Sequence, residues 1–134
     1  LHNCYQIDHA QPLFTFTHPQ PVEAFPVDNT RYNKLSFHAT QDATIHGFAG
    51  TFFSCLYKDV NISIEPKTHS PNMFSWFPLF IPLCHPVFVH RGDTVTAHVW
   101  RCKDDRKVWY EWCLSSPVCT PVQNSNGRCY WIGL

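Results

Sequence analysis

The stretch Val95–Leu114, VTAHVWRCKDDRKVWYEWCL, decides the fold class of this chain. Residues 95–102 and 108–114 are rich in β-branched and aromatic side chains, and the charged turn KDDRK lies between them at 103–107. Such runs are typical of strands, and a short polar connection between them is typical of an antiparallel hairpin. We therefore expect these two runs to pair within a β-meander.

The rest of the chain is also a succession of short extended runs separated by turn-forming residues, and no stretch has helical periodicity. The further runs that we expect to be strands are PLFTFTH (12–18), RYNKLSFHAT (31–40), IHGFAGTFFSCLY (45–57), VNISIE (60–65), PVFVH (86–90) and the segment after Asn126-Gly127. A sheet of this size usually closes or splits into two layers. The sequence therefore predicts an all-β fold, an antiparallel β-barrel or sandwich of about eight or nine strands, in a single domain over residues 1–134.

Local signals refine three of these strands. Gly47 and Gly50 indicate a bend or bulge where the long 45–57 strand curves around a core. The apolar residues of VNISIE alternate with polar ones, which predicts a half-buried strand whose polar side faces water. Asn126-Gly127 is a two-residue hairpin signal, so we expect a tight turn before the last strand.

Composition and charge exclude several classes of partner. Ten Lys and Arg residues balance ten Asp and Glu residues, so the chain has no excess positive field with which to neutralise phosphates. No apolar run approaches the roughly 20 residues that span a bilayer. The beginning LHNCYQIDHAQ lacks the charged start and apolar stretch of a signal peptide. We therefore expect neither direct nucleic-acid binding nor membrane association.

The chain has seven cysteines, an odd number, and no CxxC pair. Four of them, at positions 55, 102, 113 and 129, fall in expected strands, where an unpaired thiol behaves as a small buried hydrophobe. This favours reduced intracellular thiols over a partly disulfide-bonded secreted domain. None of the nine histidines has the close Cys/His spacing of a structural zinc site, and a metal site assembled from distant residues is the remaining alternative.

Three short motifs have both a functional and a structural interpretation. Arg91-Gly92-Asp93 matches a cell-adhesion tripeptide, but a strand-connecting turn needs a glycine and a capping Asp at these positions anyway. Asn61-Ile62-Ser63 satisfies the glycosylation sequon, yet it lies in a predicted strand, and we expect it to be unmodified. Cysteine and histidine together could form a thiol enzyme, but most thiols fall at apolar strand positions. The structural interpretation is favoured in each case.

The loop Thr68–Pro78, THSPNMFSWFP, is unusual because it carries four large apolar side chains between two prolines. Loops usually face water, so this surface needs a cover from the fold or from a ligand. Trp76 and Phe77 provide flat π faces, and Ser75 and the backbone provide hydrogen bonds, which together suit a planar guanidinium group. The alternative is that the same rings cap the end of the barrel or pack against a neighbouring domain.

Four segments of the chain resemble the carboxy-terminal β-barrel of the type II protein arginine methyltransferases, the enzymes that make symmetric dimethylarginine. These segments are HGFAGTF (46–52), LYKDVNISIEPKTHSPNMFSWFPLF (56–80), VWRCKDDRKVWYEW (99–112) and NGRCYWIGL (126–134). The resemblance extends over the whole chain and is most specific at the loop 68–78. It implies that Ser75, Trp76 and Phe77 line the pocket that receives the substrate arginine.

The resemblance also implies a mechanism, in which an arginine nitrogen attacks the methyl carbon of S-adenosylmethionine in line. Two glutamates of a Rossmann-like domain would hold the guanidinium, and positioning and electrostatics would do most of the work. That domain and an amino-terminal TIM barrel would lie outside this chain, which would therefore supply no catalytic, cofactor-binding or metal-binding residue and would be inactive alone.

The partners implied are arginine-containing proteins such as histones and spliceosomal proteins, the S-adenosylmethionine domain of the same enzyme, further copies of the enzyme and a WD-repeat protein. The implied location is cytoplasmic and nuclear. The alternatives from the residues alone are a free-standing β-sandwich that binds a partner without catalysis, and a paralogue that kept the barrel and lost catalysis.

The chain departs from the family pattern at a few positions. Asn72 stands where we expect glycine and Leu79 where we expect isoleucine, the cysteine content is higher, and the first forty residues match less closely. Asn tolerates left-handed backbone geometry, so we expect the turn at position 72 to be kept.

Overall fold

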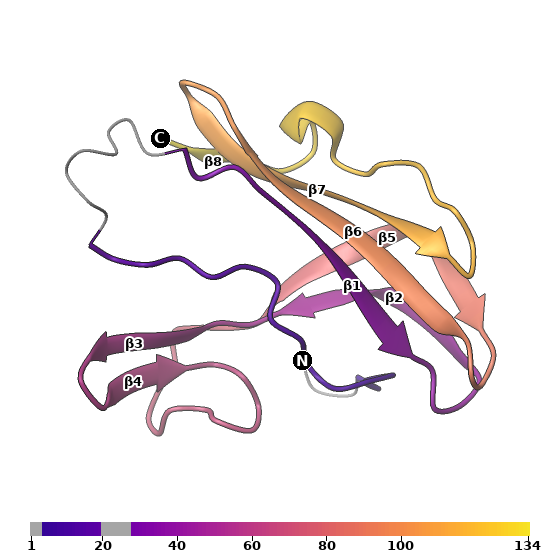
Figure 1. Ribbon diagram of the computed structural model, residues 1–134, viewed down its shortest axis with the longest axis horizontal. Coiled ribbons are helices and arrows are strands. Elements are labelled where there is room, and N and C mark those ends of the chain that lie inside the picture. The colour runs from indigo at the N-terminus through magenta and orange to yellow at the C-terminus, as the bar shows by residue number, and fades with distance from the viewer. Residues whose placement is uncertain (1–3, 20–27) are drawn as a thin grey trace. The chain divides into compact units, whose positions relative to one another are not determined.

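The computed structural model describes residues 4–19 and 28–134 (Figure 1). These residues form eight strands and one short 3-10 turn, η2 (Ser125–Gly127), and there is no α-helix among them. Every pairing with a defined register is antiparallel. The predicted all-β antiparallel class is therefore confirmed. Over the same residues, no helix has the length and apolar character that crossing a bilayer requires.

Contacts divide the described residues into two compact units. The first contains residues 4–5 and 45–87, and the second contains residues 6–19, 28–44 and 88–134.

The second unit is built on a four-stranded sheet in the order β1-β6-β7-β8 (Figure 1). Its strands are β1 (Arg31–His38), β6 (Thr94–Lys103), β7 (Lys107–Ser116) and β8 (Ile132–Gly133). β6 and β7 pair across the charged turn, with Val99 opposite Trp112. The pairing predicted for 95–102 with 108–114 is thus confirmed, as is the strand predicted at 31–40.

The two faces of this sheet differ because alternate residues of a strand point to opposite sides. One face forms the core of the unit. Its buried side chains on β6 and β7 are Val95, Ala97, Val99, Val108 and Leu114. The opposite face carries Tyr32, His98 and Trp100, whose rings stack with centroids 5.3 to 6.0 Å apart.

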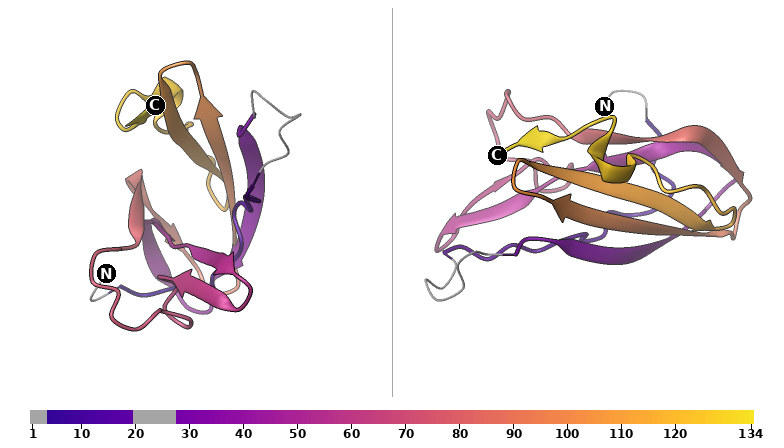
Figure 2. Two further views of the ribbon diagram at one scale, coloured as in Figure 1. Left: turned by 90° about the vertical axis from the view of Figure 1, so that its left-hand side faces the viewer. Right: turned by 90° about the horizontal axis from the view of Figure 1, so that it is seen from above.

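The first unit contains one strand pair completely and a second except for its ends, residues 43–44 and 88–89. β2 (Ala43–Gly50) pairs with β5 (Leu79–Val89), and β3 (Phe53–Tyr57) forms a hairpin with β4 (Val60–Ser63), which Figure 2 shows from two sides. The run 45–57, which we expected to be one curved strand, is therefore two strands separated at Thr51 and Phe52. Separate hydrogen-bonding partners explain the break, because β2 pairs with β5 and β3 pairs with β4.

Gly47 permits a close approach of two chains within this unit. A Cβ at this position would overlap the carbonyl oxygen of Ile81, and it would lie 2.9 Å from the ring of Phe80. Only glycine avoids this overlap without a shift of β5. Gly47 thus has a packing role in addition to the bend that the sequence indicates.

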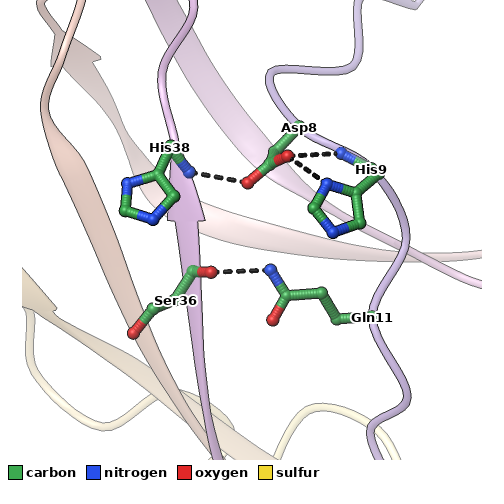
Figure 3. Close-up of polar contacts among 5 residues, drawn as sticks. All are labelled: Asp8, His9, Gln11, Ser36 and His38. Atoms are coloured by element: carbon green, nitrogen blue, oxygen red, sulfur yellow. Dashed lines mark hydrogen bonds and ion pairs between the residues drawn. The ribbon is translucent and has the colours of Figure 1, made fainter.

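The strand predicted at PLFTFTH (12–18) is wrong. The preceding residues instead lie along the edge of β1 and bond to it through side chains (Figure 3). The Gln11 amide donates to the carbonyl oxygen of Ser36 at 2.6 Å, and the Asp8 carboxylate accepts the backbone N–H of His38 at 2.7 Å. Because side chains make these bonds to the edge of β1, a backbone ladder does not form there.

The alternation predicted for VNISIE holds only in part: Ile64 is buried and Asn61 is exposed as expected, but Val60 and Ser63 are not as predicted. Val60 is 54% exposed, whereas Ser63, expected to face water, is 1% exposed. Ser63 tolerates burial because its hydroxyl lies 2.8 Å from the Thr68 hydroxyl and accepts the backbone N–H of Glu65 at 3.1 Å. The strand was therefore predicted correctly, and its buried side was predicted correctly except at Val60 and Ser63.

The hairpin predicted at Asn126-Gly127 is replaced by the 3-10 turn η2. Both residues have the positive φ that the dipeptide favours, 57° and 62°. The preceding residue Asn124 also has a positive φ, 54°, and the chain continues through residues 128–131 before the two-residue strand β8. The dipeptide thus predicted the backbone geometry but not the element.

Candidate functional site

The loop between β4 and β5 is anchored at its base by hydroxyl groups. The backbone N–H of Ser63 donates to the Ser70 hydroxyl at 3.0 Å, and the N–H of Ser70 donates back to the carbonyl oxygen of Ser63 at 2.9 Å. The hydroxyl of Thr68 donates to the Glu65 carboxylate at 2.8 Å. Residues 63–70 therefore form a fixed base from which the aromatic part of the loop extends.

Asn72 provides the turn at the start of that aromatic part. Its φ is 59°, in the left-handed region that glycine and asparagine adopt most readily. The expectation that asparagine keeps this turn is confirmed.

The structure places Ser75, Trp76 and Phe77 together on the exposed part of the loop. Trp76 is 57% exposed and meets Phe52 in an edge-to-face contact, with the ring centroids 5.2 Å apart. Phe77 is 77% exposed and Phe74 is 80% exposed. Thus one ring of the loop is held by the fold, and its neighbours present most of their surface to the surroundings.

This arrangement has a clear chemical capacity. Aromatic faces attract a cation such as guanidinium, and the attraction strengthens when water is excluded. Ser75 is exposed beside Trp76 and adds a hydroxyl that can donate or accept. The loop can therefore form one wall of a site for a planar cationic group, provided that another surface closes over it.

The cysteines are less buried than predicted. Cys55 and Cys129 are exposed, and Cys129 lies outside any strand, while Cys102 and Cys113 are half-buried in β6 and β7. All seven cysteines fall in the described residues, and none forms a disulfide. Strand edges and the open face of the sheet, which sequence alternation does not reveal, explain this exposure.

Thiol catalysis finds little support in these positions. The β6–β7 register does place His98 opposite Cys113, a juxtaposition that the order of residues could not show. However, burial raises the pKa of the Cys113 thiol, and burial with the nearby Glu111 raises that of Cys102. Both shifts disfavour the thiolate, which is the form that a catalytic nucleophile needs. In residues 4–19 and 28–134, no three Cys, His, Asp or Glu side chains gather as metal ligands.

Arg91-Gly92-Asp93 forms the turn between β5 and β6. The Asp93 carboxylate accepts the backbone N–H of His90 at 2.8 Å, and Gly92 has a φ of 92°. The backbone N–H of Arg91 donates to the Asp42 carboxylate at 2.8 Å. These contacts confirm the structural role that turn chemistry predicts for the tripeptide.

The stacked rings on the open face of the second unit are a feature that sequence reasoning missed. The Tyr32 hydroxyl lies 2.8 Å from Nδ1 of His98, and Nε2 of His98 lies 2.9 Å from the Ser115 hydroxyl. A shallow cavity of about 370 Å³ lies against Tyr32, Trp100 and their neighbours. The alternation of His98 and Trp100 was a usable signal, but their partner Tyr32 could be found only from the β1–β6 register.

Comparison with known proteins identifies the family. Residues 1–132 match the model of the PRMT5 oligomerisation domain. The protein arginine N-methyltransferase 5 of Xenopus laevis is 48% identical over 134 residues, which cover 100% of this chain and 21% of that protein. The protein arginine N-methyltransferase 5 of Oryza sativa subsp. japonica is 47% identical over 137 residues, with 100% and 21% covered.

A more distant relative agrees with these matches. The protein arginine N-methyltransferase skb1 of Schizosaccharomyces pombe is 39% identical over 137 residues, which cover 90% of this chain and 22% of that protein. The chain thus spans about a fifth of the length of the curated relatives that it matches. The chain belongs to the family of PRMT5 oligomerisation domains, the carboxy-terminal domains of arginine methyltransferases.

Proposed function

We propose that this chain is the structural and substrate-binding β-domain of a protein arginine N-methyltransferase. The enzyme would transfer methyl groups from S-adenosylmethionine to arginines of proteins such as histones and spliceosomal proteins, with symmetric dimethylarginine as the product. Support comes from the family match and from relatives named as arginine N-methyltransferases. The observation that carries the proposal is the anchored loop whose large rings are exposed beside Trp76.

In this proposal Trp76 and Phe77 wall in the substrate guanidinium, and Ser75 helps to order the loop. The contact between Phe52 and Trp76 fixes one ring before the substrate arrives, which reduces the ordering cost of binding. A guanidinium against such a ring gains roughly 0.5 to 2 kcal/mol, with the larger values when water is excluded. The loop is thus a positioning wall and takes no part in proton transfer.

The cofactor chemistry would come from the rest of the enzyme. The five glycines of this chain never occur in the G-x-G spacing of a dinucleotide-type phosphate turn, so its residues do not fit S-adenosylmethionine by that signature. The carboxylate of Asp104 is committed to its own turn, where it accepts the N–H groups of Arg106 and Lys107 at 2.8 and 2.9 Å. These hydrogen bonds, of which that from Arg106 has the largest effect, lower the pKa of Asp104. This carboxylate therefore stabilises the turn and is poorly suited to act as a catalytic base.

The proposed assembly follows from the family. The enzyme would form a homo-oligomer, in keeping with the family's description as an oligomerisation domain, and would bind a WD-repeat protein in the cytoplasm and nucleus. The S-adenosylmethionine domain of the same polypeptide would provide the surface opposite the loop.

The test is Trp76→Ala in the complete enzyme, assayed on an arginine-containing peptide. We expect kcat/KM for the peptide to fall by roughly 2- to 30-fold, the equivalent of a lost cation–π contact, while the Kd for S-adenosylmethionine stays unchanged. Trp131→Ala is the matched control, since Trp131 is 55% exposed but lies in the second unit. Equal loss of peptide turnover and cofactor binding, or equal effects of the two substitutions, would contradict the proposal.

A further inference from the structure

The chain doubles back after β7 and runs beside it. The backbone N–H of Thr120 donates to the carbonyl oxygen of Leu114 at 3.0 Å, and the N–H of Leu114 donates to the Thr120 hydroxyl at 2.9 Å. Further along, the N–H of Gln123 donates to the carbonyl oxygen of Trp112 at 2.8 Å. The returning segment, residues 117–123, is therefore held against the outer edge of β7, and Figure 2 shows it in yellow beside that strand.

This return brings two cysteines into one neighbourhood. Cys113 directly precedes Leu114 and Cys119 directly precedes Thr120, so the thiols flank the bonded pair. The thiol of Cys119 lies 3.5 Å from the carbonyl oxygen of Ser115, two residues beyond Cys113 on the same strand. Alternation along β7 places the side chains of Cys113 and Ser115 on the same face.

The electrostatics of Cys113 agree with this geometry. Burial raises its pKa, and the nearby sulfur of Cys119 raises it further. Cys102, the other half-buried thiol on this face, has Glu111 rather than a cysteine as its charged neighbour.

We propose that Cys113 and Cys119 form a reversible oxidation site that takes a low-molecular-weight disulfide, such as glutathione disulfide, as its oxidant. A disulfide requires a Cα separation of about 4.4 to 6.8 Å, whereas diagonal neighbours across an antiparallel pair lie about 7 to 8 Å apart, so the bridge requires a small movement of residue 119 toward β7. Cys119 is exposed and lies outside any strand, so the returning segment can make the short approach while β7 stays in place.

The reaction is a two-step thiol–disulfide exchange. The thiolate of exposed Cys119 attacks one sulfur of the oxidant, forming a mixed disulfide and releasing one glutathione thiolate. Cys113, after losing its proton to solvent base, attacks the Cys119 sulfur and releases the second glutathione. The protein dithiol loses two electrons, the oxidant gains them, and two glutathione molecules leave as thiols. Burial and a raised pKa make Cys113 slow to attack an oxidant from solution, so it reacts only after the mixed disulfide on Cys119 holds a sulfur beside it.

Oxidation of both cysteines can be detected in a single tryptic peptide. Trypsin cuts after Lys107 and Arg128, and Cys113 and Cys119 are the cysteines of the peptide 108–128. The complete protein is incubated in its native state at graded ratios of reduced to oxidised glutathione. Its free thiols are then blocked with an alkylating reagent, and the tryptic peptides are analysed by mass spectrometry. We expect this peptide to convert to a form two hydrogens lighter that carries no alkyl group, and to revert on addition of reduced glutathione.

Three variants separate the two steps. Cys113→Ser should stop at a glutathione adduct on Cys119, and Cys119→Ser should leave the peptide reduced. Cys102→Ser, the matched half-buried control, should form the bridge as the natural chain does. The proposal is overturned if the native protein yields only glutathione adducts on the 108–128 peptide. It is also overturned if the bridge forms no faster in the folded protein than in urea, since proximity would then contribute nothing.

Discussion

The buried amide of Asn124 holds the carboxy-terminal segment to β7, and its replacement tests how much that segment depends on one side chain. Asn124 is 8% exposed and has a left-handed backbone, with φ 54°. Its Nδ2 donates to the carbonyl oxygens of Tyr110 and Tyr130, both at 2.8 Å. Its Oδ1 accepts the N–H groups of Cys129 and Tyr130 at 2.9 and 3.0 Å. One side chain thus satisfies four backbone groups.

The expected cost of Asn124→Ala follows from these four bonds. At about 0.5 to 1.5 kcal/mol each, their loss removes roughly 2 to 6 kcal/mol. Cys129 and Tyr130 are exposed, so water can replace part of what they lose, and the lower half of that range applies. Alanine in a left-handed conformation adds about 1 kcal/mol. We therefore expect a loss of about 3 to 5 kcal/mol in the free energy of unfolding.

Urea unfolding of the 134-residue chain, followed by tryptophan fluorescence, measures this loss as a lower midpoint with an unchanged slope. In the complete protein, hydrogen exchange reports the same loss at the backbone amides of Cys129 and Tyr130. Asn126→Ala is the matched control, because Asn126 also has a left-handed backbone, φ 57°, but is exposed. Its cost should be about 1 kcal/mol. Similar losses in the two variants would refute the reasoning, because the four amide bonds would then contribute nothing.

Two further predictions concern other contacts of the fold. Hydrogen bonds from the backbone N–H of His38 and then from His9 lower the pKa of Asp8 below its usual 3.8. The Asp8 carboxylate therefore contributes stability above pH 3.8, and this contribution is lost as the pH falls through the pKa of Asp8 in the folded protein. Asp8→Asn should therefore be less stable than the natural chain at neutral pH, with a difference in urea midpoint that shrinks below about pH 4; a constant difference would contradict this. Gly47→Ala should cost about 1 to 3 kcal/mol because the new Cβ overlaps the carbonyl of Ile81. Gly50→Ala, whose Cβ would meet its nearest neighbour at 3.5 Å, should have little effect on the same urea midpoint, and equal losses would rule out the overlap.

The parts of the fold that the sequence predicted correctly are those with local causes. The β6–β7 hairpin combines two strand-forming runs with a charged turn, and the Arg91-Gly92-Asp93 turn combines a positive φ with a capping carboxylate. Each of these is complete within about twenty residues, so the residues that determine it can be seen together.

The failures arose where a distant partner decided the outcome. The segment 12–18 has the apolar content of a strand, but the residues before it bond to β1 through the side chains of Asp8 and Gln11. Ser63 is polar and yet buried, because the loop that follows it returns to satisfy its hydroxyl. The alternation of apolar and polar residues describes one strand at a time, so it predicts neither which strand lies at the edge of a sheet nor the path of a loop.

The candidate site was predicted in the same partial way. The composition of the loop 68–78 identified Trp76 and Phe77, and the left-handed turn at Asn72 followed from residue chemistry. The contact between Trp76 and Phe52 joins two separate segments of the chain, so it could be found only from the structure.

The two groups of exposed rings in this chain differ in what covers them. On the open face of the second unit, Tyr32, His98 and Trp100 stack on one another, so each ring hides part of the next. In the loop of the first unit, Phe77 remains 77% exposed although the base of the loop is firmly bonded. Leaving such a ring in water forgoes about 1.5 to 3 kcal/mol that its burial would contribute.

That difference indicates where a second surface is required. A ring that stacks on its neighbours already has a structural reason to be aromatic, whereas Phe77 gains little from the fold that displays it. The chain spans about a fifth of its relatives, so the remaining sequence of such a protein is available to face the loop. A substrate guanidinium held between that surface and the loop would cover the rings and exclude water, which are the two conditions under which cation–π attraction is strongest. If the proposed function holds, the exposure of the loop is the physical reason to look for the substrate arginine at Trp76 and Phe77 rather than at the stacked rings of the other unit.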